Sequence, residues 1–178
     1  MKADRRPALL RRGVILLTTI GLVAAGLLLL TQNLPAADPE LQARQTQIAD
    51  KGREVMPFDL ERTTHRFAKA DSGGVQTVFA DVPTDDQQIA LIRRHVAKEA
   101  EAYSRGDFGD PASIHGSAMP GLSELEGGYR SIDVRYAQTP AGAQITYTTT
   151  DNALVRALHA WFDAQVSDHG NHAEGHSG

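Results

Sequence analysis

Histidine is the residue type in this sequence with the greatest capacity for chemistry. The chain contains seven histidines and no cysteine, so a transition metal would have to be bound by imidazole nitrogen and methionine sulfur. Imidazole suits copper, zinc and nickel, and a thioether adds a preference for Cu(I). His115 and Met119 form the most ligand-like pair, because both lie in a glycine- and proline-rich stretch. The sequence therefore predicts a copper-type site made by His115 and Met119 and completed by His65 or His159.

Each of these histidines also has a purely structural interpretation. His65 begins a predicted strand and can pair across a hairpin, whereas His159 lies beside Trp161 and can be a half-buried core residue. His95 flanks an apolar helical stripe, and with Glu99 four positions later it is either a two-ligand site or a solvated pair. These alternatives stay open at the level of sequence.

The C-terminal histidines are explained more simply. His169 lies in the last turn of a predicted helix, where a cationic ring is favoured by the helix dipole. His172 and His176 fall in the final residues and predict only weak, nonspecific metal affinity.

No motif of a known catalytic site occurs in the sequence. A Gly-x-Ser-x-Gly elbow, a phosphate-binding loop, a His-Glu-x-x-His helix and a dinucleotide fingerprint are all missing. Asp85 and Asp86 suit the start of a helix, and Asp107 and Asp110 suit turns, although the latter two could also bind a cation. We assign no catalytic or cofactor-binding residue, and the sequence favours a role other than that of an enzyme.

Residues 55–170 have the pattern of one small α+β domain. Two stretches, 63–70 and 75–82, flank Asp71-Ser72-Gly73-Gly74 and predict a β-hairpin. A helix follows from an N-cap at Thr84, with Gln87 completing a capping box, to Gly106. After the loop 107–129, alternating residues predict a second hairpin over 132–149 and a helix from Asp151 to Gly170. The expected fold is ββα-loop-ββα, with a four-stranded antiparallel sheet and two long helices on one face.

The terminal segments predict export and attachment to a membrane. Residues 1–12 hold five basic side chains and one acid, and 13–31 form an uncharged apolar stretch about 28 Å long as a helix. This pattern predicts a single-pass signal anchor in the cell membrane, with the N-terminus in the cytoplasm and a periplasmic or extracellular domain. A cleaved signal peptide is the alternative, and it would also export the domain. Residues 32–54 suggest a polar stalk, and 171–178 a disordered tail.

Several stretches resemble a family of small bacterial proteins often labelled aspartate carbamoyltransferase. They are 56–60 (MPFDL) with 64–67 (THRF), the loop segment 114–122, and the ending 158–170. The resemblance covers most of residues 55–170 and implies transfer of a carbamoyl group to aspartate. The Ser-Thr-Arg-Thr loop of the larger two-domain carbamoyltransferases has no counterpart in this sequence.

Three functions follow as hypotheses. The first is a membrane-anchored extracytoplasmic accessory protein that binds copper, and the second is a metal-free module that contacts an unknown protein partner. The third is the transferase that the resemblance implies. Nucleic acid is not expected as a partner, because the net charge is −4 and no basic cluster follows residue 12.

Overall fold

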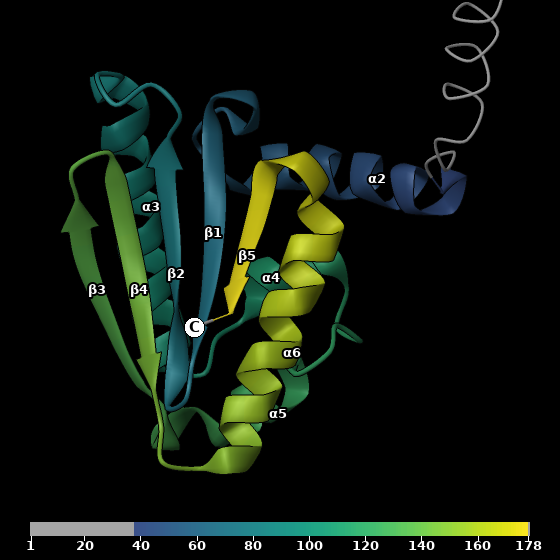
Figure 1. Ribbon diagram of the computed structural model, residues 1–178, viewed down its shortest axis with the longest axis vertical. Helices are drawn as coiled ribbons and strands as arrows, with labels where there is room; N and C mark the ends of the chain where they lie inside the picture. The colour runs from purple at the N-terminus through teal and green to yellow at the C-terminus, as the bar shows by residue number, and fades with distance from the viewer. Residues whose placement is uncertain (1–37, 178) are drawn as a thin grey trace, which may run out of the picture. The chain divides into compact units, whose positions relative to one another are not determined.

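The computed structural model describes residues 38–177 (Figure 1). The helices and strands follow in the order α2 (Pro39–Val55), β1 (Thr63–Ala70), β2 (Gly73–Ala80), α3 (Asp86–Ser104), α4 (Gly109–His115), α5 (Leu122–Gly128), β3 (Asp133–Thr139), β4 (Gly142–Thr148), α6 (Asn152–His169) and β5 (Ala173–Ser177). Short 3-10 turns cover Leu60–Arg62, Tyr129–Ser131 and Gly170–His172. The class is α+β, as predicted.

The sheet has five strands in the order β3-β4-β2-β1-β5. Four of them are antiparallel, whereas β5 pairs in parallel with β1, from His65 opposite Ala173 to Lys69 opposite Ser177. The predicted four-stranded antiparallel sheet is therefore wrong in detail, and so is the disordered tail. Residues 173–177 have little strand propensity of their own, and the open edge of β1 supplies the partner that orders them.

Both long helices pack on one face of the sheet, as expected. Alternate side chains of β1, β2 and β4 are buried against α3 and α6, and they join one hydrophobic core. Trp161 of α6 is fully buried there and touches Tyr103 of α3 and Tyr147 of β4 edge-to-face. The other face of the sheet carries half-exposed residues.

An aspartate side chain caps the N-terminus of both α3 and α6. The side chain of Asp85 accepts a hydrogen bond from the amide of Gln88, so the N-cap of α3 is Asp85, one residue after the predicted cap at Thr84. Asp151 caps α6 as predicted, accepting from the amide of Ala153 at 2.7 Å. Gly170 ends α6 with φ of 55°, a left-handed value that glycine adopts without strain.

The predicted stalk is a helix that belongs to the folded domain. Helix α2 packs against α6 and α4, and Ile48 and Gly52 are buried. A Cβ atom at position 52 would lie 3.2 Å from the Leu60 side chain, so glycine allows α2 to pack closely against Leu60. Polar contacts to α6 add to this thin apolar face, because Gln45 donates to the carbonyl of Ser167 at 2.9 Å. The compact unit begins at Pro39.

The predicted loop 107–129 contains two short helices, α4 and α5. Gly116 and Gly121 adopt φ of 94° and 78° and turn the chain between these helices. The loop is thereby folded over the core, with Leu122 and Leu125 buried.

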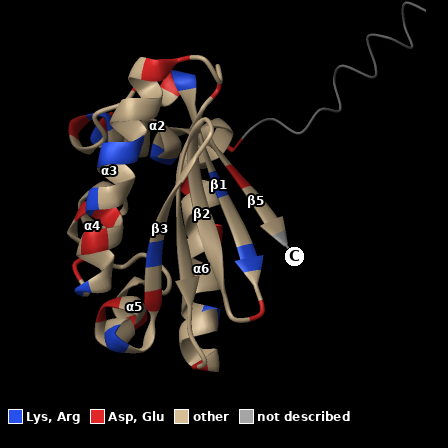
Figure 2. Ribbon diagram, turned by 90° about the vertical axis from the view of Figure 1, so that its left-hand side faces the viewer, with Lys and Arg blue, Asp and Glu red and all other residues tan. Residues whose placement is uncertain are grey.

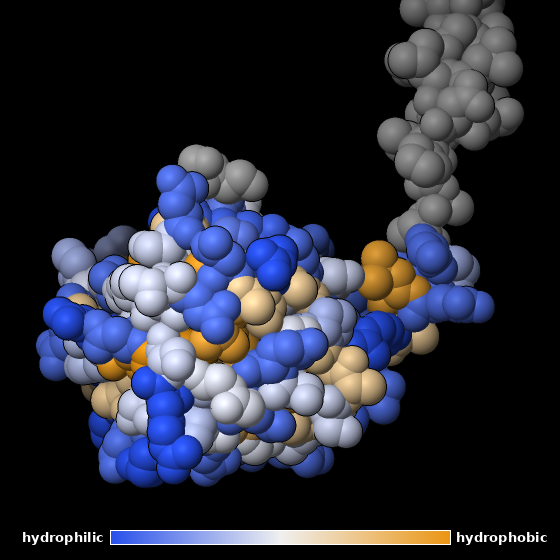
Figure 3. Space-filling model, turned by 90° about the horizontal axis from the view of Figure 1, so that it is seen from below, coloured by the Kyte–Doolittle hydropathy of each residue, from blue (hydrophilic) through white to orange (hydrophobic). Residues whose placement is uncertain are grey.

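The predicted cytoplasmic segment 1–12, the anchor 13–31 and the first residues of the stalk lie outside the described residues. Within residues 38–177, no helix is both long and apolar enough to cross a bilayer. On the side shown in Figure 2, basic and acidic side chains are interspersed along α3. Seen from below, the surface is mostly hydrophilic and its apolar residues occur in separate spots (Figure 3).

Candidate functional site

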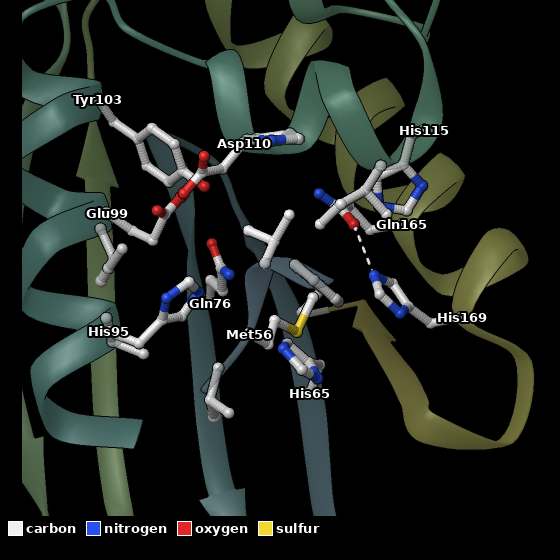
Figure 4. A pocket seen from close by; sticks show the side chains of 17 residues that line it. Met56, His65, Gln76, His95, Glu99, Tyr103, Asp110, His115, Gln165 and His169 are labelled. Carbon is white, nitrogen blue, oxygen red and sulfur yellow. Dashed lines mark hydrogen bonds between the residues drawn. The ribbon is translucent and has the colours of Figure 1, made fainter. Parts of the chain in front are cut away.

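Four histidines meet at one cavity between the helices and the sheet. His65 comes from β1, His95 from α3, His115 from the end of α4 and His169 from the end of α6. The ring centroids of His65 and His169 are 5.2 Å apart in a stacked arrangement, and those of His115 and His169 are 4.9 Å apart edge-to-face. We call this cavity the histidine pocket (Figure 4).

The pocket is narrow and opens on one side. Its half-buried lining residues are Val55, Met56, His95 and Asp110, so the mouth lies between the end of α2, α3 and α4. The cavity volume is about 30 Å³. One water needs roughly 10–15 Å³ of cavity volume, so the pocket suits an ion or about two waters. Pockets for organic metabolites are usually several hundred Å³.

His115 is held by a buried carboxylate. Its Nδ1 lies 2.8 Å from Oδ2 of Asp168, and the side chains are 1% and 5% exposed. Arg44 of α2 binds the same carboxylate through two hydrogen bonds, of 2.5 Å from Nε and 2.6 Å from Nη2. Burial alone would raise the pKa of Asp168, but its hydrogen bonds with Arg44 and His115 lower it below its usual range. Asp168 is therefore ionised and accepts the Nδ1 proton of His115, which leaves Nε2 with its lone pair.

The other two inner rings are arranged in a similar way. Nε2 of His169 lies 3.2 Å from Oε1 of Gln165, which fixes one nitrogen of that ring. The ring of His65 hydrogen-bonds the backbone of His172, while its buried Nδ1 has no hydrogen-bond partner. Each of the three rings thus has one nitrogen engaged by a neighbouring group, and the second remains for a ligand.

All four rings are kept neutral by their surroundings. Burial, followed by nearby imidazoles, lowers the pKa of His65 to about 3 and that of His169 well below its ordinary value. Burial likewise lowers the pKa of His95 to about 4. The pKa of His115 is also lowered by burial, although Asp168 acts in the opposite direction. Neutral imidazole is the form that binds metals.

The structure brings together two of the four predicted ligands and separates the other two. His65 and His115 both line the pocket. Met119 is buried in the hydrophobic core instead, because α4 ends at His115 and Gly116 turns the chain away from the helical spacing. His159 lies at the β1–β2 turn, where its Nε2 is 3.1 Å from the carbonyl of Ala70 and 2.9 Å from that of Gly73.

Sequence reasoning missed several residues of the pocket. His169 was interpreted as a dipole-stabilised helix end, yet it lies between His65 and His115. Met56 places a thioether at the mouth. Asp168 supports His115 from 53 residues away, and Arg44 binds Asp168 across 124 residues of sequence. No local pattern could have linked residues so far apart.

No three His, Asp or Glu side chains in the described part of the chain are arranged to hold a metal ion together. The predicted four-residue site is thus not preformed. Nor does any protein-family model match this chain, and no curated protein or solved structure is significantly similar to it. Fold and pocket together define an α+β domain with a buried, histidine-lined cavity of the size of an ion.

Proposed function

We propose that this chain is a membrane-anchored extracytoplasmic accessory protein that binds one soft transition-metal ion of the copper(I) type in the histidine pocket. The ligands in this proposal are nitrogens of His65, His115 and His169, with the sulfur of Met56 available at the mouth. The observation that carries the proposal is the buried and unpaired Nδ1 of His65 beside two further rings that each have a nitrogen to spare.

The support around His115 is of the kind that metal-binding histidines use. Such a histidine usually donates its second N–H to a carboxylate, which fixes the ring and increases the basicity of the metal-binding nitrogen. Asp168 takes this role, and Arg44 in turn fixes Asp168 with two hydrogen bonds. A buried nitrogen without a partner, such as Nδ1 of His65, costs about 1–3 kcal/mol, and a bound ion would relieve that cost.

The choice of ion follows from the geometry and the donor set. Bonds of about 2 Å from an ion to two nitrogens keep those nitrogens within about 4 Å of each other. Ring centroids 4.9 and 5.2 Å apart are within the range that a rotation of the rings can bridge. Zn²⁺ needs four tetrahedral ligands, whereas Cu(I) is stable with two or three, and a thioether favours Cu(I). Cu(I) therefore requires the smallest rearrangement.

The site can be tested by measuring Cu(I) affinity anaerobically with the full-length chain in mild detergent, in competition with a chromophoric Cu(I) chelator. We expect one Cu(I) per chain. His115→Gln and His169→Gln should weaken binding at least a hundredfold, because each removes a ligand. Asp168→Asn should weaken it about 10- to 100-fold, because it removes only the support of a ligand. His159→Gln and Met119→Leu are the matched controls, since neither residue lines the pocket.

Two results would contradict the proposal. A wild-type chain that fails to bind Cu(I) would exclude the metal function. Equal affinities of the wild type and His169→Gln would place bound copper elsewhere, for example at the exposed His176. Membrane attachment is tested separately, by asking whether the intact chain in cells sediments with membranes and resists extraction by carbonate.

A further inference from the structure

The side of the histidine pocket away from His115 and His169 carries a pair of carboxyl groups (Figure 4). Glu99 of α3 is 5% exposed and shares a hydrogen bond with Asp110 of α4. Two carboxyl groups in direct contact hold one proton between them, because two adjacent negative charges out of water repel strongly. The Glu99–Asp110 pair therefore contains a proton inside a pocket whose imidazoles are neutral.

The groups around this pair decide which member holds the proton. Lys98 binds Asp110 at 3.1 Å on the exposed side of α3, and the hydrogen bonds from Glu99 and Lys98 lower the pKa of Asp110. Burial and the contact with Asp110 raise the pKa of Glu99 to about 7. Asp110 is thus the carboxylate, and Glu99 is the carboxylic acid.

The remaining residues that line the pocket carry no negative charge, and the carboxylate of Asp168 lies behind His115. Tyr103 of α3 and Tyr147 of β4 are buried phenols that interact with Glu99, and burial raises the pKa of both. Strand β2 contributes Gln76 and α6 contributes Gln165, both uncharged. Val55 at the end of α2 and Met56 directly after it are also uncharged. His95 faces Asp110 from α3, and the pKa of about 4 keeps its ring neutral.

A cation in this pocket needs a counter-charge. Transferring an ion out of water into a protein interior costs several kcal/mol unless an opposite charge accompanies it. The charge of Asp110 is already balanced by Lys98, and that of Asp168 by Arg44. Glu99 is the remaining carboxyl group of the pocket, and it can become negative by losing its proton.

Resting on the proposed function, we propose that Glu99 is the counter-charge of the bound ion, so that the pocket exchanges one proton for one monovalent cation. The O–H bond of Glu99 breaks, the proton leaves to solvent, and its carboxylate remains in the same pocket as the cation. The net charge of the pocket is the same before and after binding. This exchange favours singly charged soft ions over doubly charged ones, which would leave one positive charge uncompensated.

The exchange is measurable with Ag⁺, a monovalent soft ion that does not change oxidation state under these conditions. The full-length chain in chloride-free buffer with mild detergent is titrated with silver nitrate by calorimetry between pH 5.5 and 8. Repeating the titration in two buffers of different ionisation enthalpy counts the protons released. We expect about one proton per Ag⁺ at pH 6, and an affinity that rises close to tenfold per pH unit until it levels off above pH 7.

Glu99→Gln should still bind Ag⁺, but with weaker affinity at pH 8, no proton release and no dependence on pH in this range. Glu101→Gln is the matched control, because Glu101 is exposed on the same helix and pairs with Arg105 at 2.6 Å. The control should retain the pH dependence of the wild type. The wild-type proton count tests the idea even if Glu99→Gln does not fold.

The outcomes separate the two proposals. Wild-type protein that binds Ag⁺ with the same affinity from pH 5.5 to 8 overturns the role of Glu99 but leaves the metal site intact. The same conclusion follows if Glu99→Gln releases a proton like the wild type. Failure of the wild type to bind Ag⁺ or Cu(I) overturns both.

Discussion

The buried neutral ring of His65 predicts that the protein loses stability as the pH falls. Its pKa is about 3 in the folded chain, against an ordinary value of 6.5 that applies when the chain is unfolded. Below pH 6.5 the unfolded chain therefore binds more protons than the folded chain. Acid stabilises the unfolded chain in this way, and the free energy of unfolding falls. The contribution of His65 is fully present above pH 6.5 and is lost progressively down to about pH 3.

The magnitude at pH 5 follows from the two pKa values. At this pH the imidazole of His65 is almost wholly protonated in the unfolded chain and neutral in the folded chain. This difference lowers the free energy of unfolding by about 2 kcal/mol relative to neutral pH. Between pH 5 and 6 the free energy of unfolding should change by about 1.3 kcal/mol per pH unit on account of His65. Against a total stability of roughly 5–15 kcal/mol, one such ring is a substantial fraction.

The variant His65→Leu isolates this effect. Leucine cannot be protonated, so the difference in unfolding free energy between variant and wild type should grow in favour of the variant as the pH falls. At pH 8 we expect the variant to be as stable as the wild type or slightly more stable, because it removes a buried nitrogen without a partner. The assay is urea denaturation of the metal-free chain, with a chelator present, at pH 5, 6, 7 and 8.

The comparison also cancels the titrating groups that do not contact His65. Glu99 acts in the opposite direction, because its folded pKa is raised to about 7 and its contribution is lost as the pH rises from about 4.5 to 7. That contribution is the same in both chains and drops out of the difference. Phe67→Leu is the control, since this buried neighbour on β1 stacks on His65 and carries no proton. Parallel pH profiles of His65→Leu and the wild type would refute the reasoning.

Two further predictions concern the fold. A chain that ends at His172 lacks β5, so the amides of residues 65–69 in β1 should exchange with D₂O faster than in the full chain, and unchanged exchange would show that β5 does not pair. Gly121→Ala should lower the unfolding free energy by about 3 kcal/mol or more, because a Cβ atom there would lie 2.0 Å from the carbonyl oxygen of Ala157 and φ is 78°. Urea denaturation measures this loss, with Gly127→Ala as control because a Cβ atom at position 127 meets no atom within 4 Å.

The elements whose signals are local could be predicted from the sequence. Strand β1 spans the predicted residues, and α3 and α6 lie within the ranges predicted for the two long helices. The error in β2 has a physical cause. Gly73 and Gly74 were interpreted as turn residues, but they belong to the strand, and a Cβ atom at Gly73 would lie 2.1 Å from the carbonyl oxygen of Tyr147. The missing side chain of Gly73 lets β4 lie close to β2, and the alternation of apolar residues along the sequence does not reveal this.

Helix α2 and strand β5 could not be predicted for a different reason. Neither has an apolar pattern strong enough to indicate burial, and both are stabilised by partners far away in sequence. Helix α2 depends on α6 through Arg44 and Gln45, and β5 depends on the edge of β1. Single-sequence reasoning weighs local propensity, and such tertiary stabilisation overrides it.

The histidine pocket shows the same dependence on tertiary structure. The three inner rings come from β1, α4 and α6, and each ring alone had an adequate local explanation. Their shared property, burial next to one another, exists only after the segments 56–67, 114–115 and 165–169 pack together.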